Sequence, residues 1–322
     1  MRCCSARSPA PSTLFDMKAL RWPLWVLEAV PVFGLLAIFK ILRVDAASAF
    51  GGWLGRTLAP IAPAHDTARR NLKAAYPEKS DADIRAILLS MWENLGRTFA
   101  EYAHFRAFAG FPNRRIQVEG LEHARTALAA GNGAIALSGH CANWELMAVS
   151  AFQAGLAGAE VYRPINNPIV NWWVMRQRKR FAYPVQISKN GDNVRELLRT
   201  LKEGGVLAML TDQKHSEGLP IPFFGRDAWT ATGPAVLGLR TGAALVPVRM
   251  VRLKGARFRM TFLPPIEVSR SGDKNADIRA TLTAINRALE DAVRDHPEQW
   301  LWAHNRWRIP AHAQPGISGA AS

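Results

Sequence analysis

From about residue 116 onward, short apolar runs alternate with segments in which apolar residues recur at helical spacing. Each apolar run has the length of a buried strand, and the runs lie at 133–138, 159–163, 206–211, 244–250 and 258–263. The helical patterns lie between and after them, at 143–156, 166–181, 191–203, 233–242 and 274–295. Alternation of this kind predicts an α/β domain in which helices cover a mixed, largely parallel sheet.

Before residue 116 the pattern is mainly helical. The segment "TARRNLKAAY" places Leu72 and Ala75 on one face, and the next helix begins with a capping box formed by Ser80 and Asp83. Apolar residues then recur at 84, 87, 88, 91 and 95. We therefore divide the chain into a disordered extension (1–16), a membrane anchor helix (17–45), a helical region (46–115), the α/β domain (116–310) and a disordered tail (311–322).

The anchor is predicted from an apolar run at 22–39, in which Glu28 is the one charged residue. At about 1.5 Å per residue such a helix is roughly 27 Å long, enough to cross the hydrocarbon core of a bilayer. Trp22 and Trp25 lie at one end of the run, and Lys40 and Arg43 follow the other end, as interfacial anchors do. We expect a spanning or deeply inserted helix.

Two other interpretations of this run stay open. A signal peptide cleaved after the "ASA" at 47–49 would have a long apolar region, interrupted near the cut by Lys40 and Arg43. A buried or interfacial helix is favoured by Glu28 and Pro31, which a lipid-facing span resists. Met17 is an alternative start of the chain, because residues 1–16 carry no pattern of a structured element.

The composition fits a protein with a packed core, since 48% of the 322 residues are hydrophobic and 21% are charged. The charge is unbalanced, because 41 Lys and Arg face 26 Asp and Glu and give a net charge of +15. Such a surface favours anionic partners, which are nucleic acid, acidic lipid head groups or an acidic protein. The three cysteines, Cys3, Cys4 and Cys141, argue against a disulfide framework and against a zinc site, and indicate a reducing compartment.

The stretch "SGHCANWELMA" (138–148) carries the residues best suited to catalysis. His140 lies in a loop between a predicted strand and a helix, and Glu145 lies in the first helical turn, with Asn143 as a candidate cap. Ligands bind in such loops at the ends of parallel strands. A neutral imidazole can accept a proton from an alcohol, and a carboxylate that folds back onto it holds the tautomer and stabilises the imidazolium.

The chain has no GxSxG serine motif, so this pair predicts direct attack of an acceptor hydroxyl on an activated acyl group. Two alternatives remain for the same stretch. Cys141 is a rival thiolate nucleophile. The spacing of His140 and Glu145, taken alone, favours a structural loop histidine and a helix-capping glutamate over a catalytic pair.

Several ordered blocks between Leu24 and Pro310 give the chain its family likeness. They read "RRNLKAAYPEKSDADI", "HCANWE", "VYRPINNP", "LTDQ", "IPFFGRDAWTATGPAVLGLRTGAALVPV" and "HPEQWLWAHNRWR". On these blocks the chain resembles the bacterial lipid A biosynthesis (lauroyl/myristoyl) acyltransferases, which are related to glycerolipid-type acyltransferases with a His-x4-Asp/Glu motif. Asn305 departs from the family pattern, which usually has arginine there.

The resemblance implies roles for particular residues. His140 and Glu145 match the family's catalytic pair, Arg163 matches a functionally important arginine, and Asp212 matches an important acid. After its strand, Arg163 can clamp a phosphate or hold a developing oxyanion, and Asp212 can position Arg163 or bind an acceptor hydroxyl. Each also fits an ordinary structural ion pair. Phe223, Phe224 and Gly225 are candidates for an acyl-chain wall, although aromatic pairs are more often core.

The resemblance further implies the reaction, its partners and its place in the cell. We expect a fatty acyl group to pass from acyl carrier protein to a hydroxyacyl group of a Kdo-bearing, phosphorylated lipid A precursor, as a step of lipopolysaccharide biosynthesis. No metal or cofactor is expected. The protein is expected at the bacterial inner membrane, with the catalytic domain on the cytoplasmic face and in contact with membrane lipids.

Two basic stretches, at 172–180 and 249–259, fit anionic head groups, acidic acyl carrier protein or a merely solvated face. Likewise, the tryptophan-rich end "QWLWAHNRW" fits either the membrane interface or a core with an arginine packed on it. Two other functions stay open. One is acyl transfer from acyl-CoA to a glycerolipid or glycolipid. The other is a non-catalytic, basic nucleic-acid-binding protein, against which the apolar N-terminus and the lack of a recognised nucleic-acid module argue, so nucleic acid is not an expected partner.

Overall fold

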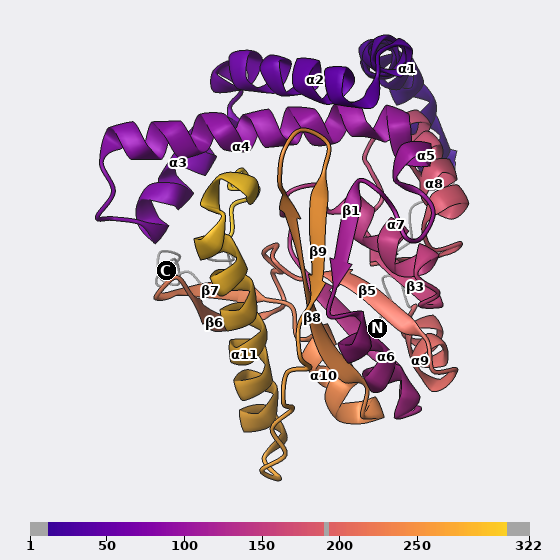
Figure 1. Ribbon diagram of the computed structural model, residues 1–322, viewed down its shortest axis with the longest axis vertical. Coiled ribbons are helices and arrows are strands. Elements are labelled where there is room, and N and C mark those ends of the chain that lie inside the picture. The colour runs from indigo at the N-terminus through magenta and orange to yellow at the C-terminus, as the bar shows by residue number, and fades with distance from the viewer. Residues whose placement is uncertain (1–11, 190–192, 308–322) are drawn as a thin grey trace, which may run out of the picture.

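The computed structural model describes residues 12–189 and 193–307. Its centre is a seven-stranded sheet with the order β1-β9-β8-β2-β5-β3-β4 (Figure 1). Strands β8, β2, β5, β3 and β4 are parallel to one another, while β9 runs antiparallel to β8, and β1 is parallel to β9. The strands are β1 (Ile116–Glu119), β2 (Ala134–Ser138), β3 (Gly158–Tyr162), β4 (Val185–Ser188), β5 (Val206–Leu210), β8 (Ala244–Arg252) and β9 (Phe258–Phe262).

Helices cover both faces of this sheet, as the sequence pattern predicts. One apolar core lies between the sheet and α5 (Phe105–Phe108), α6 (Leu121–Ala129) and α7 (Glu145–Gln153). A second core lies between the opposite face and α9 (Val194–Lys202), α10 (Gly233–Thr241) and α11 (Lys274–Asp295). The predicted mixed, largely parallel α/β fold is therefore confirmed.

A layer of helices lies across one end of the sheet. It comprises α1 (Ser12–Ile41), α2 (Val44–Leu58), η1 (Ala59–Ile61), α3 (Ala64–Ala75), α4 (Asp81–Glu101) and η2 (Tyr102–His104). Helices α2 and α4 approach closely because glycines face each other, and a Cβ on Gly96 would lie 2.1 Å from the carbonyl oxygen of Gly51. The Ser80 hydroxyl accepts from the Asp83 amide and donates to its carboxylate, which confirms the predicted capping box.

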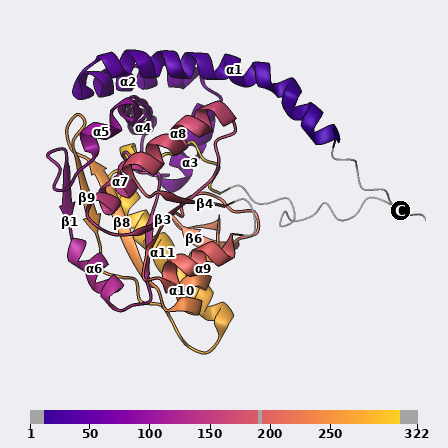
Figure 2. The ribbon, with the colours of Figure 1, turned by 90° about the vertical axis from the view of Figure 1, so that its right-hand side faces the viewer.

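Helix α1 begins and ends a few residues before the predicted anchor helix at 17–45, since it stops at Ile41, and its C-terminal part is attached to the body of the protein. It begins at Ser12, so the expectation of a disordered extension at 1–16 is wrong for its last five residues, where no proline or glycine stops the helix. Residues 1–11 lie outside the described part of the chain. Figure 2 shows α1 and α2 running along one edge, with the N-terminal end of α1 projecting past the rest. Leu36 and Phe39 of α1 are buried in this contact.

The segment Arg21–Ile41 of α1 is long and apolar enough to cross a membrane, and 17% of its most apolar stretch is buried against the protein. Its one acidic residue has a partner, because the Asn167 amide donates to the Glu28 carboxylate at 3.1 Å and to the Trp25 carbonyl at 2.8 Å. Asn167 is the N-cap of α8 (Pro168–Phe181), so α1 is fastened to α8. The proposed signal-peptide cut falls inside α2, where Ala47 and Ser48 are buried.

Four strands escape the sequence analysis. Strands β1 and β4 are four residues long and half polar, which gives too little pattern to detect. The antiparallel hairpin of β6 (Leu219–Phe223) and β7 (Arg226–Thr230) stands outside the main sheet and carries two prolines, as only edge strands can. The five predicted strands and the five predicted helices of the α/β domain are all present, with ends that differ by a few residues.

The tryptophan-rich end of the chain is core. After η3 (Pro297–Gln299), Trp300 and Trp302 are fully buried, and the Arg306 guanidinium lies 5.3 Å from the centre of the Phe223 ring. Burial lowers the pKa of Arg306 to about 10. Asn305, the departure from the family pattern, is an exposed side chain between these buried residues. The interpretation as a membrane interface is therefore wrong for Trp300 and Trp302. Residues 308–322, which include the predicted disordered tail at 311–322, lie outside the described part.

Candidate active site

Three neighbouring parallel strands end at one edge of the sheet and bring the candidate residues together. His140 follows β2, Asp212 follows β5, and Arg163 follows β3. Because β5 lies between β2 and β3, Asp212 stands between the other two strand ends. The site therefore forms where ligands bind in open parallel sheets.

Asp212 holds the imidazole of His140. Its Oδ1 lies 2.7 Å from His140 Nδ1, and its Oδ2 accepts from the His140 backbone amide at 2.7 Å and from the Trp300 indole at 2.8 Å. Gly139 allows this approach, because a Cβ there would lie 3.1 Å from Asp212 Oδ2 and 2.7 Å from Leu289. Burial alone would raise the pKa of Asp212, but His140 and these hydrogen bonds hold it well below its usual range. Asp212 is therefore an ionised, fixed hydrogen-bond acceptor.

The other imidazole nitrogen faces an amide. The Gln213 side-chain nitrogen lies 3.2 Å from His140 Nε2 and 2.8 Å from His304 Nε2. An amide nitrogen only donates, so with this placement both imidazoles accept at Nε2. His140 then carries its proton on Nδ1, against Asp212, and keeps a lone pair on Nε2. This is the tautomer that a general base requires. Gln213 and His304 were not among the residues predicted, although both stand in the quoted blocks "LTDQ" and "AHNRW".

The histidine pair makes stability depend on pH in one direction. Burial and the nearby His140 lower the pKa of His304 to about 4, against 6.5 in an unfolded chain. As pH falls below about 6.5, the unfolded chain binds a proton at this histidine, whereas the folded protein binds it only near pH 4, so the free energy of unfolding decreases between these two pH values.

The urea concentration at the midpoint of unfolding should decrease between about pH 7.5 and about pH 5, and this decrease should be smaller in His304→Gln than in the wild type. Exposed His215→Gln is the control and should leave the loss unchanged, and equal losses in all three proteins would contradict this assignment.

Glu145 does not fold back onto His140. Its carboxylate accepts from Arg178 at 2.8 Å (Nε) and 2.6 Å (Nη2), and from the Trp144 indole at 3.1 Å. The helix begins at Glu145 with Trp144 before it, and Asn143, the expected cap, donates instead to Glu101. The expectation that Glu145 braces the imidazole is therefore wrong in geometry, because α7 directs the carboxylate towards α8.

Arg178 stands between two buried carboxylates. Besides Glu145 it approaches Glu160 of β3 at 3.7 Å. Burial would raise the pKa of Glu145, but the charge and hydrogen bonds of Arg178 outweigh it and lower that pKa. For Glu160 burial prevails over Arg178, and the negative charge of Glu145 adds to it, so the pKa is raised. Trp144, fixed by Glu145, packs edge-on against His140 at 5.1 Å between ring centres, so the cluster supports the wall of the site.

An open cavity of about 390 Å³ lies in front of His140. Its wall includes His140, Trp144, Glu160, Tyr162, Arg163, Ile165, Arg178, Lys189, Gln213 and His304. Positive side chains predominate in this wall, because the Asp212 carboxylate is hydrogen-bonded to His140 and the Glu160 carboxylate is paired with Arg178. The cavity can therefore receive an anionic substrate beside a base.

An apolar slot of about 50 Å³ continues from this cavity between the sheet and α7. The two share Trp144, Glu160, Val161 and Leu210. Further in, alanine and methionine side chains line the slot together with branched and aromatic ones; the alanines and methionines include Ala136, Met147, Ala148, Ala151, Ala208 and Met209. A hydrocarbon chain entering at the shared residues would lie along α7.

The aromatic candidates for an acyl wall lie elsewhere. Phe223 ends β6, and Phe224 and Gly225 form its turn, where the rings pack against Trp300, Trp302 and Trp307. Neither ring lines the cavity or the apolar slot. That prediction is wrong because the hairpin leaves the main sheet and folds into the core beside α3 and α4.

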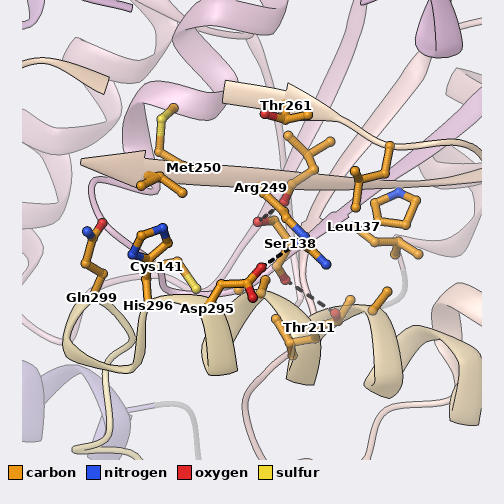
Figure 3. Close-up of a pocket in the computed structure, with 18 of the residues that line it drawn as sticks. Leu137, Ser138, Cys141, Thr211, Arg249, Met250, Thr261, Asp295, His296 and Gln299 are labelled. Carbon is orange, nitrogen blue, oxygen red and sulfur yellow. Dashed lines mark hydrogen bonds and ion pairs between the residues drawn. The ribbon is translucent and has the colours of Figure 1, made fainter. Parts of the chain in front are cut away.

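A second cavity, of about 200 Å³, lies behind the loop that carries His140, between β8, β9 and α11 (Figure 3). Gly139, Cys141 and Thr211 line it, but His140 does not, and the Arg249–Asp295 ion pair at 2.9 Å crosses it. The Cys141 side chain thus faces away from the cavity that His140 lines. Burial, aided by Asp212, raises the pKa of this thiol far above its usual value. The alternative of a Cys141 nucleophile is not supported.

Comparison with known proteins shows similarity to several acyltransferases. The family model of bacterial lipid A biosynthesis acyltransferases matches residues 17–309. The lipid A biosynthesis lauroyltransferase of Escherichia coli (strain K12) is 30% identical over 257 residues, which cover 76% of this chain and 79% of that protein. The palmitoleoyltransferase of the same strain is 26% identical, covering 85% and 89%. A phosphatidylinositol mannoside acyltransferase of Mycolicibacterium smegmatis (strain ATCC 700084 / mc(2)155) is 26% identical, covering 74% and 78%.

Proposed function

Since the chain belongs to the bacterial lipid A biosynthesis acyltransferase family and is an acyltransferase, we propose the following reaction for it. A fatty acyl group passes from the thioester of acyl carrier protein to a hydroxyacyl chain of a Kdo-bearing, phosphorylated lipid A precursor. His140 is the general base. The observation that carries the proposal is the Asp212-bound imidazole, which lines a cavity that shares part of its wall with an apolar slot.

The tautomer of His140 determines which nitrogen accepts the proton of the acceptor. His140 Nε2 takes the proton of the acceptor hydroxyl, whose oxygen attacks the thioester carbonyl carbon and forms the new C–O bond. The imidazolium that results is stabilised by ionised Asp212. As the tetrahedral intermediate collapses, the C–S bond breaks and His140 returns the proton to the thiolate. Asp212 is a positioning residue for the base, and Glu145 positions Trp144 and Arg178, which line the cavity.

The apolar slot is the proposed site of the acyl chain. Deeper occupation requires Met147 and Met209 to change rotamer, which unbranched thioether side chains do readily. Ala151 lies on α7 two turns beyond the shared rim, and is buried.

Ala151→Leu should shift transfer towards shorter acyl chains, because the added carbons fill the inner part of the slot. A misfit of one methylene is worth about 1–3 kcal/mol, so we expect a change of roughly 10- to 100-fold in the ratio of long- to short-chain transfer. Competition between two acyl thioesters, resolved by mass spectrometry, measures this ratio. Exposed Ala129→Leu on α6 is the matched control, and an unchanged ratio in Ala151→Leu would remove the chain from this slot.

Helix α1 supports a location at a membrane. We propose the bacterial inner membrane, with the α/β domain on the cytoplasmic face, where carrier-protein thioesters are found. The candidate span at Arg21–Ile41 supports it. The exposed basic residues Arg176, Lys179 and Arg180 on α8, which packs beside α1, suit acidic lipid head groups or acidic acyl carrier protein.

Mass spectrometry of lipid A from cells with and without the protein tests the reaction. The expected result is the loss of one secondary acyl chain in cells without it, restored by the wild type and not by His140→Gln. An unchanged lipid A in both cells would overturn the proposal.

A glycolipid acceptor with an acyl-CoA donor is the second candidate. The likeness to the phosphatidylinositol mannoside acyltransferase is the observation that favours it. Parallel assays with both acceptors and both donors distinguish the two. The cavity does not support nucleic-acid binding, because its cations lie beside the His140 imidazole and not along an extended surface.

A further inference from the structure

We propose that Arg163 and Lys189 form a phosphate-binding site inside the active-site cavity, which holds a sugar phosphate of the acceptor while its hydroxyl meets His140. The inference rests on the proposed function and assigns a role to Lys189, a residue outside the predicted set.

The two cations are brought together by strand pairing. Arg163 directly follows β3 and Lys189 directly follows β4, and these strands are parallel neighbours with Tyr162 opposite Ser188. The Lys189 backbone amide donates to the Tyr162 carbonyl at 2.8 Å, which fixes the two strand ends side by side. Both side chains line the same cavity as His140. The placement therefore comes from the sheet, not from a mobile loop.

Neither cation is neutralised within the described part of the chain. The cavity's third cation, Arg178, has two carboxylates, Glu145 and Glu160. The Asp212 carboxylate is bound to His140 and Trp300. Arg163 and Lys189 form no ion pair with the residues of 12–189 and 193–307. Two like charges so placed are unfavourable without an anion between them.

The electrostatics agree with this geometry. Lys189 and Arg163 are both exposed to the open cavity; partial desolvation lowers the pKa of Lys189, Asp212 opposes that effect, and the charge of Arg163 lowers the pKa further. The charges of Arg163 and Lys189 also lower the pKa of His304, in addition to the effect of its burial. A bound dianion would relieve this repulsion and raise the pKa of Lys189. Arginine offers a fork that fits phosphate oxygens, and lysine adds a point charge.

The length of the substrates decides which phosphate fits. The donor's phosphate stands at the far end of the pantetheine arm, while its thioester must reach His140. A phosphate on the acceptor sugar, next to the acylated position, is separated from the reacting hydroxyl by fewer bonds than the pantetheine phosphate is from its thioester. A site within the same cavity as His140 therefore suits the acceptor phosphate.

The test combines enzyme variants with two acceptors, the phosphorylated precursor and the same precursor after phosphatase treatment. In the wild type, removal of the phosphate should reduce kcat/KM by about 10- to 100-fold, the size expected for charge-assisted hydrogen bonds. Lys189→Met and Arg163→Met should show a similar loss on the phosphorylated acceptor, mainly in KM, and little further loss on the treated one. Lys202→Met, an exposed cation at the end of α9, is the control and should behave as the wild type.

Two results would overturn the site. Equal losses on both acceptors would mean that the cations act on the oxyanion. A loss that disappears only when the carrier-protein thioester is replaced by a donor lacking the pantetheine phosphate would place the donor phosphate there.

Binding separates this inference from the reaction itself. His140→Gln protein should retain the phosphorylated precursor in detergent micelles, and the additional change Lys189→Met should weaken that binding by about 10- to 100-fold. If the wild type transfers no acyl group but this difference in binding is found, the proposed reaction fails and the phosphate site stands. Equal binding by both proteins would refute the site.

Discussion

Acyl transfer should fall by about 10²- to 10⁴-fold when His140 is replaced by glutamine, because the hydroxyl then lacks its general base. Glutamine keeps much of the size of the side chain and offers no basic nitrogen, so binding of both substrates should persist. Initial rates with purified protein, carrier-protein thioester and lipid A precursor in micelles measure the loss. We expect kcat to carry it, with KM little changed.

Exposed His215→Gln is the matched control for this change and should transfer at the wild-type rate. An alternative nucleophile would show itself directly. If His140→Gln keeps a rate within a few-fold of the wild type, the base lies elsewhere. If Cys141→Ser loses as much transfer activity as His140→Gln, the buried thiol takes part in the reaction although it lines the second cavity.

Stability should fall by about 3–5 kcal/mol when Arg178 is replaced by methionine, because the change leaves two carboxylates buried without their cation. Glu145 and Glu160 both approach the guanidinium of Arg178, and both are at most slightly exposed. One of the two must then bind a proton in the folded protein. The folded-state pKa of the pair rises above the unfolded value, so the variant should become less stable as pH rises from about 5 to about 8.

Urea unfolding of Arg178→Met, of Arg178→Met with Glu145→Gln, and of exposed Arg176→Met measures this effect. The second change removes one carboxylate and should return a large part of the lost free energy, since replacing a whole buried ionic group costs far less than breaking it. Arg176→Met should unfold as the wild type. Equal stability of Arg178→Met and Arg176→Met would show that the cluster is not buried and paired as described.

Five of the seven strands of the main sheet could be predicted from the sequence because each of them leaves an apolar run, whereas β1 and β4 are too short and too polar to do so. His140 and Asp212 both follow such runs. The loop after β2 singles out His140, whereas Asp212 was predicted from its match to an important acid of the family. What the sequence does not contain is the order of strands in space. Nothing in the runs at 133–138 and 206–211 says that these two strands are neighbours, and this neighbourhood alone brings Asp212 to the imidazole.

The spacing of His140 and Glu145 misled for the same reason. A short separation in the chain suggests contact, whereas the start of α7 turns the carboxylate towards Arg178 on another helix. Likewise, the sequence shows that Phe223 and Phe224 are apolar but does not show towards which part of the protein they point. The hairpin places them in the core. Lys189 had no signal at all, since its importance arises from the pairing of β3 with β4.

The most direct test of the site is a comparison of two isosteric amides, Asp212→Asn and Glu145→Gln, at equal amounts of folded protein. Asp212→Asn should lower kcat by about 10²- to 10⁴-fold, because an amide cannot stabilise the imidazolium or hold the reactive tautomer. Glu145→Gln should keep most of its turnover per folded molecule, since the carboxylate it replaces serves Arg178 and Trp144. The reverse order, with Glu145→Gln inactive and Asp212→Asn near the wild-type rate, would contradict the assignment of Asp212 as the partner of the base.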